Sequence, residues 1–151
     1  MRKIRLIWVG KSKDSFIRDG VDKYLKLLKP YVRVELVEIK GAKDTGRKTL
    51  TNREGLRILE KTSSFILLDE GGTEMTSLEF TGFLEKHILY ASLPRDFVIG
   101  GAYGVSEDVR QAAWKTLSLS RMTFTHQMVR VALLEQIYRA FTIIKGKAYH
   151  Y

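Results

Sequence analysis

Short apolar runs alternate with helical patterns along all 151 residues, and this alternation limits the possible folds more than any other feature. Apolar residues recur at three- and four-residue spacing between the runs, which is the period of a helix. Strands are expected over residues 3–9, 32–39, 64–69, 96–101 and 117–119, with helices over 14–29, from 52 to about 62, from 77, from 106 and over 127–144. Continuous apolar strands separated by helices predict an α/β fold with a parallel sheet covered on both faces. The pattern does not give the strand order.

The ends of these elements carry recognisable start and stop signals. Pro30 ends the first helix, because proline cannot continue it. A basic loop is expected over residues 41–51. Helix N-caps are expected at Asn52, Ser77 and Ser106, and a turn at Gly71-Gly72.

Length and composition indicate one domain spanning residues 1–151. The chain has no cysteine, which excludes disulfides, thiolate chemistry and cysteine metal sites, and we expect no metal. No apolar run reaches the roughly 20 residues of a membrane span. The apolar stretch after the basic start covers only residues 6–9, too short for a signal peptide. We therefore expect a cytoplasmic protein with no membrane partner.

The charge is distributed unevenly. Residues 1–63 hold 17 basic and 8 acidic side chains, whereas residues 64–151 hold 9 of each, so the first part carries the whole net charge of +9. A basic surface attracts polyanions through phosphate contacts and counterion release. Nucleic acid is the expected partner, although a basic face that only keeps the protein soluble is the alternative.

Two loops at consecutive strand ends predict a small-ligand pocket. Residues 100–104, Gly-Gly-Ala-Tyr-Gly, let a ligand approach the backbone, or form a plain turn. Their spacing is neither G-x-G-x-x-G nor a P-loop, which disfavours a dinucleotide or a triphosphate. Residues 120–125 alternate hydroxyl and apolar side chains, which suits an adenosine-type ligand. Asp69 follows a strand and either binds a ribose hydroxyl or forms a turn.

The last helix is apolar nearly all round, which predicts burial and suggests a homodimer interface. Glu135 and Arg139 have the spacing of a helix-face ion pair. Arg130 has no such partner, and its role stays open between phosphate or substrate contact and structural pairing. His126 opens this helix beside the second loop, and the penultimate His150 is suited to accept a proton near neutral pH.

The motifs over residues 97–151 identify a family. Gly-Gly-x-x-Gly after an apolar strand is followed by Leu-Ser-Leu-Ser-Arg-Met-Thr-Phe-x-His-Gln-Met-Val-Arg, then Leu-Leu-Glu-Gln-Ile-Tyr-Arg-Ala and a closing Tyr-His. The chain resembles the ribosomal RNA large-subunit methyltransferase H family of the SPOUT superfamily. The resemblance extends over the full length and implies a C-terminal trefoil α/β knot, which is a rare exception to the rule that protein chains are unknotted.

The resemblance also implies a ligand, a reaction and a partner. The cofactor would be S-adenosyl-L-methionine, and the reaction N3-methylation of a pseudouridine in 23S rRNA. The enzyme would be a homodimer in which the partner chain completes each site. By motif position the cofactor contacts would be Leu68, Gly101, Ser120, Arg121, Met122, Thr123, Phe124 and Thr125. The family usually has proline where this chain has Thr125, so the loop is expected to be less rigid.

The mechanism expected from this resemblance needs a proton acceptor, because the pseudouridine N3 must lose its proton. We predict His150 as that base, with Tyr149 and Tyr151 closing over the target base and Arg130 holding a phosphate or the developing anion. Two alternatives stay open: a non-catalytic RNA- or ribosome-binding module, and a knot methyltransferase that acts on tRNA.

Overall fold

The computed structural model describes residues 2–43 and 46–150. Five parallel strands form one sheet in the order β2-β1-β4-β3-β5. The elements in chain order are β1 (Lys3–Val9), α1 (Ser15–Leu28), β2 (Arg33–Ile39), α2 (Arg47–Lys61), β3 (Phe65–Glu74), α3 (Ser77–Leu84), the π-helical turn η1 (Glu85–Leu89), β4 (Asp96–Ile99), α4 (Glu107–Ala112), β5 (Lys115–Ser118) and α5 (His126–Ile144). The predicted parallel sheet flanked by helices is confirmed.

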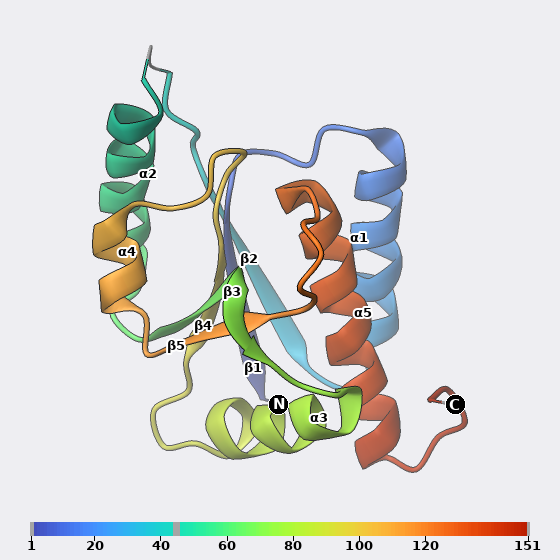
Figure 1. Ribbon diagram of the computed structural model, residues 1–151. Coiled ribbons are helices and arrows are strands. Elements are labelled where there is room, and N and C mark those ends of the chain that lie inside the picture. Colours follow the sequence, from blue (N-terminus) through green and yellow to red (C-terminus); the bar gives the residue numbers. More distant parts are fainter. Residues whose placement is uncertain (1, 44–45, 151) are drawn as a thin grey trace.

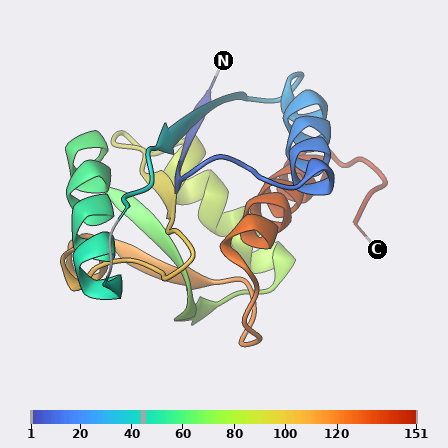
Figure 2. The same ribbon diagram turned by 90° about the horizontal axis from the view of Figure 1, so that it is seen from above.

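The helices form a layer on each face of the sheet (Figures 1 and 2). Along β1, Leu6 and Trp8 face a core that α1, α3 and α5 complete. Ile7 and Val9 alternate with them and face a smaller core beneath α2 and α4. Both sides of the strand are therefore buried, which is why its sequence is continuously apolar.

Two predicted helix starts differ from the structure. Helix α2 begins at Arg47, so Asn52 is not its N-cap and only the first part of the basic segment is a loop. The Thr51 hydroxyl donates a hydrogen bond to the carbonyl of Arg47, 2.9 Å away. This bond satisfies the hydroxyl within the additional N-terminal helical turn. Helix α3 is capped by Thr76, not Ser77, because Thr76 and Glu79 form a reciprocal capping box.

The predicted Gly71-Gly72 turn is instead part of β3. The pairing of β3 with β5 shifts register between Leu68 and Thr73, so β3 bulges and then rejoins its neighbour. A Cβ on Gly72 would lie 2.6 Å from the backbone of Thr116, which only glycine avoids. The glycines here serve a close strand contact, and the chain does not reverse.

Candidate active site

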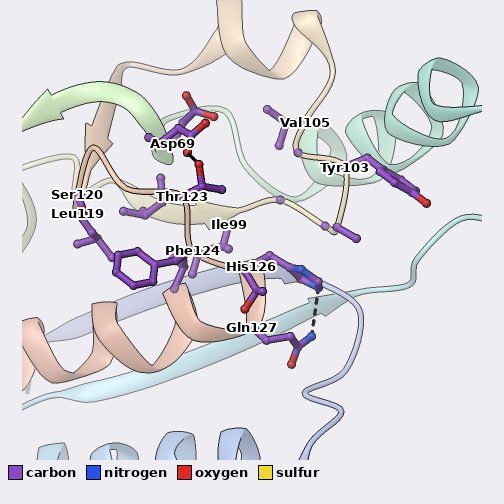
Figure 3. A pocket seen from close by; sticks show the side chains of 18 of the residues that line it. Asp69, Ile99, Tyr103, Val105, Leu119, Ser120, Thr123, Phe124, His126 and Gln127 are labelled. Carbon is purple, nitrogen blue, oxygen red and sulfur yellow. Dashed lines mark hydrogen bonds between the residues drawn. The ribbon is translucent and has the colours of Figure 1, made fainter.

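A pocket of about 760 Å³ opens at the carboxyl ends of β4 and β5 and beside the bulge in β3 (Figure 3). Its walls are the ends of these strands, the loops that follow β4 and β5, and the first residues of α1 and α5. This volume lies within the range of roughly 300–1,000 Å³ that small-molecule sites occupy. The two loops predicted from the sequence to form a ligand pocket lie together here.

The first loop is a tight turn. The amide of Gly104 donates to the carbonyl of Gly101 at 3.0 Å, and Gly104 has a φ of +79°. A Cβ on Gly100 would lie 2.8 Å from the carbonyl oxygen of Gly104, so a side chain there would force the turn apart. The turn therefore exposes backbone to the pocket and lifts Ala102 and Tyr103 to its rim.

The second loop is braced by its own hydroxyl groups. Ser118 donates to the carbonyl of Ser120 at 2.7 Å, and the Ser120 hydroxyl accepts from the amide of Met122 at 3.0 Å. The Thr123 hydroxyl donates to the carboxylate of Glu70 in β3. The loop is thus tied to β3 and to the end of β5, so contacts within the protein hold its conformation.

Seven of the eight residues that the sequence assigned to the ligand line this pocket. They are Leu68, Gly101, Ser120, Met122, Thr123, Phe124 and Thr125. The eighth, Arg121, is not among the lining residues, because its 86% exposed side chain turns outward to Glu74, 3.6 Å away. Its place in the sequence motif alone did not show which way the side chain points.

Thr125, where the family usually has proline, is the N-cap of α5. Its φ of −61° is one that proline adopts, so the backbone at this position would suit a proline as well. Its hydroxyl also accepts from the amide of Met128 at 3.2 Å, a contact that proline lacks. Thr125 therefore combines a backbone angle that suits proline with a side-chain cap on α5.

Arg130 is completely buried below the β1–α1 loop. Its guanidinium donates to the carbonyl of Val9 at 2.7 Å and to the Ser12 hydroxyl at 3.2 Å, and it lies 4.8 Å from the Trp8 ring centroid. Burial lowers the pKa of Arg130 to about 10. Of the two roles left open by the sequence, the contacts show structural pairing, since no part of this side chain is exposed for a phosphate in the single chain.

Gln127 makes a second connection between α5 and the same loop. Its side-chain oxygen accepts from the amide of Lys13, and its nitrogen donates to the carbonyl of Lys11, both at 3.2 Å. Next to it, His126 lines the pocket, and burial lowers its pKa, helped by Arg130 and Lys13. The start of α5 is therefore fixed to the basic β1–α1 loop, with a neutral imidazole favoured at the pocket wall.

Two carboxyl groups at the pocket make contacts within the protein. Asp69 lines the pocket in the bulged part of β3, where it accepts from the amide of Gly71 at 3.0 Å and pairs with Arg110 at 3.1 Å. Glu54 on α2 is buried, and its carboxyl accepts from the amide of Ala42 at 3.1 Å. Burial raises the pKa of Glu54. No sequence signal pointed to Glu54, since nothing in a helical pattern shows which charged residue a tertiary contact covers.

The C-terminal tail folds back on the last turns of α5. The Tyr149 hydroxyl donates to Glu135 at 3.3 Å, and the Tyr149 ring lies 4.9 Å from the guanidinium of Arg139. An Nη1 of Arg139 lies 3.4 Å from Nδ1 of His150. Because arginine can only donate, Nδ1 accepts, and the proton of a neutral His150 ring lies on Nε2. The tail cluster of Glu135, Arg139, Tyr149 and His150 thus gathers a base, a cation and a phenol; Tyr151 lies outside the described residues.

The tail cluster and the pocket lie at opposite ends of α5 (Figure 1). The helix has 19 residues, so its ends are roughly 27 Å apart. The spacing in the sequence predicted Arg139 only as the ion-pair partner of Glu135. The pair is present, but Arg139 also contacts both tail residues, a role that spacing along the helix cannot show.

The sheet and its pocket define an α/β protein with a cavity of small-ligand size beyond the carboxyl ends of parallel strands. A family described as predicted SPOUT methyltransferase matches residues 2–150. The chain therefore belongs to the SPOUT methyltransferase family and is a methyltransferase. This membership implies the family's α/β knot.

Curated relatives carry a more specific name. The protein named ribosomal RNA large subunit methyltransferase H in Geotalea uraniireducens (strain Rf4) is 44% identical, with 99% of each chain covered. Its namesake in Thermodesulfovibrio yellowstonii is 45% identical over the whole of both chains. The namesake in Geobacter sulfurreducens is 43% identical over 99% of each chain. The resemblance noted from the motifs is confirmed over the full length.

The pocket fits a methyl donor that carries a nucleoside. Apolar side chains of Leu68, Ile99 and Leu119 provide a surface for a flat ring, and the hydroxyls of Ser120 and Thr123 provide polar contacts. Among residues 2–43 and 46–150, no group of three or more His, Cys, Asp or Glu side chains could hold a metal ion. In the same residues, no helix is long and apolar enough to cross a membrane.

Proposed function

We propose that this chain transfers a methyl group from S-adenosyl-L-methionine to N3 of a pseudouridine in 23S rRNA, acting as a homodimer. The proposal is supported by the names of the relatives, by the pocket and by the basic first part of the chain. One observation carries the homodimer: the donor pocket and the tail cluster lie at opposite ends of α5, so the tail of a second copy must complete each site.

The donor supplies an activated methyl group when it is bound. The residues for holding it are the glycine turn, the apolar strand ends and the loop with Ser120 and Thr123. Alignment of the accepting nitrogen with the methyl group is a main source of rate in such a transfer. The braced second loop supports this task because its conformation does not have to form during the reaction.

The tail handles the proton of the target base. Nδ1 of His150 first gives up its contact with Arg139 and turns to the target uracil ring. It then accepts the N3 proton. Arg139 then stabilises the anion that develops on the uracil ring. Tyr149 closes over the base, and its hydrogen bond to Glu135 holds the tail on α5 until the substrate arrives. Arg130 acts as a positioning residue that fixes the start of α5.

The outer face of α5 offers a surface for the second copy. Met128 is 38% exposed and Phe124, in the adjoining loop, 50% exposed. Both line a hollow of about 450 Å³ together with Val131 and Ala132. An apolar face of this kind favours a twofold interface in which the same patch meets its own copy.

Transfer of a labelled methyl group tests the reaction. Purified large subunits, intact ribosomes and tRNA are each incubated with the enzyme and labelled S-adenosyl-L-methionine, and the label is then mapped. We expect label at one uracil-type base of 23S rRNA. Label in tRNA, or donor binding in calorimetry without any transfer, would contradict the proposal and favour one of the two alternatives.

Mixed dimers test the shared site. His150→Ala disables the tail, and Thr123→Trp fills the pocket, so each variant alone is expected to be inactive. Mixing equal amounts should restore about a quarter of wild-type activity, because half of the dimers then contain one complete site. Calorimetry checks that Thr123→Trp has lost the donor. A mixture as inactive as its components would show that the tail acts within its own chain.

A further inference from the structure

Tyr103, which lines the rim of the pocket, and the start of α2 form a feature to which the proposed function assigns no role. The turn between Gly101 and Gly104 lifts Tyr103 to the rim, where 52% of the residue is exposed. In Figure 3 its ring extends outward from the pocket. The guanidinium of Arg47, the first residue of α2, lies 4.6 Å from the centroid of that ring. The cation–π contact holds the ring in place and leaves much of its surface open.

The surface around this ring is positively charged. Helix α2 carries five basic and two acidic residues, and one of the acids, Glu54, is buried. Lys48 lies next to Arg47 and is exposed, as is Lys43 just before the helix. Exposed aromatic rings beside basic side chains form the surfaces on which proteins stack unpaired bases and hold phosphates.

This surface stays open in the proposed dimer. Helices α2 and α4 cover one face of the sheet, and α1, α3 and α5 cover the other (Figures 1 and 2). A second copy docked on α5 therefore leaves the start of α2 free. The ring lies on the rim of the donor pocket, so an RNA strand that reaches the pocket on this side passes over it.

We propose that Tyr103 is a stacking platform for an unpaired nucleotide next to the target base, with Lys48 and Lys43 on the neighbouring phosphates. The inference rests on the proposed function and names the RNA contact of the same site. The target base must leave its stack to reach the pocket, and this exposes the neighbouring base. Stacking on Tyr103 compensates for the lost stack, and Arg47 keeps the ring at the required place.

The chain provides a matched control in Tyr90. This tyrosine is 61% exposed, and the guanidinium of Arg2 lies 5.1 Å from its ring centroid. It precedes β4, so it lies at the end of the sheet opposite the pocket. Tyr103 and Tyr90 therefore share exposure and a stacked arginine, and they differ in their distance from the donor.

The experiment compares Tyr103→Ala with Tyr90→Ala, using intact ribosomes that carry unmethylated 23S rRNA as the probe. Base stacking is worth about 1–3 kcal/mol, so Tyr103→Ala should lower kcat/KM for ribosomes by about 5- to 150-fold. Tyr90→Ala should stay within about twofold of wild type. Tyr103→Trp should restore activity, since tryptophan also stacks. Lys48→Glu should weaken RNA binding and reduce its salt dependence.

Two further measurements separate the possible failures. The affinity for S-adenosyl-L-methionine in calorimetry should be similar in Tyr103→Ala and wild type; a parallel loss would assign Tyr103 to the donor and overturn the inference. Equal effects of the two alanine variants, or no rescue by tryptophan, would also overturn it. Filter binding of 23S rRNA is measured alongside. If wild type binds this RNA but methylates none of it, the proposed function fails. In that case, weaker RNA binding by Tyr103→Ala, but not by Tyr90→Ala, still supports the stacking contact.

Discussion

The two ends of α5 each carry an arginine, and the two side chains lie in opposite environments. Arg130, in the second turn, has no exposed surface and holds the carbonyl of Val9 and the hydroxyl of Ser12. Arg139, near the other end, has a 23% exposed side chain and contacts Glu135 and His150. The first end is fixed to the sheet and shapes the pocket, whereas the second presents partly exposed groups at the surface.

This difference shows that one helix can hold a rigid pocket wall at its first end and the groups proposed for proton transfer at its other end. A donor pocket benefits from fixed walls, because positioning is a main source of rate. A proton acceptor must reach the substrate, and the proposed second copy brings it there. The predictions below test whether one end of the helix carries stability and the other carries turnover.

The largest expected effect is on turnover, at the tail. His150→Ala should lower methyl transfer by about 10²- to 10⁴-fold, because a positioned proton acceptor contributes this much. Donor affinity should not change, since His150 does not line the pocket. Single-turnover transfer to ribosomes and calorimetry with the donor measure the two quantities. Unchanged transfer would rule out His150 as the base and remove the contrast between the ends.

The next effect is on stability, at the other end. Arg130→Ala should lower the free energy of unfolding by about 3 kcal/mol, because one buried and one part-buried hydrogen bond from a charged group are lost. Arg139→Ala is the matched control and should cost less than about 1 kcal/mol, as a partly exposed ion pair contributes little. Urea denaturation of both variants measures the difference. Equal losses would show that α5 is held evenly along its length.

A smaller effect is expected at the start of α5. Thr125→Ala removes the side-chain cap and should cost about 1 kcal/mol. Thr125→Pro loses the same cap but suits the φ of −61° and stiffens the unfolded chain, which returns up to about 1 kcal/mol. Its stability should therefore lie between alanine and wild type in thermal unfolding. A proline variant less stable than the alanine variant would show that the amide of Thr125 matters.

The smallest effect is a pH dependence at the pocket wall. Burial lowers the pKa of His126, so folding favours its neutral form. Its contribution to stability is present above its unfolded pKa of about 6.5 and is lost as the pH falls through the lower folded value. The stability of wild type relative to His126→Gln should therefore fall between about pH 8 and pH 5. A constant difference across this range, measured by urea denaturation, would show that His126 does not titrate with folding.

Local sequence signals predicted most of the elements and the pocket loops. The apolar runs located all five strands, and glycines and hydroxyls marked the two loops that line the pocket. Boundaries were less accurate where two signals compete. Thr76 displaced Ser77 as a cap because Glu79 completes its capping box, and Gly71-Gly72 formed a bulge because β5 pairs on both sides of it.

The sequence by itself determined the parallel sheet, the two loops that line the pocket, the basic first part and the family, because each depends on neighbouring residues or on a count. Only the tertiary structure decided which way the side chains of Arg121, Arg130 and Arg139 point, because distant segments set their surroundings. Tertiary structure also separated pocket and tail by the length of α5. A helix keeps residues close in sequence while it places its two ends far apart in space.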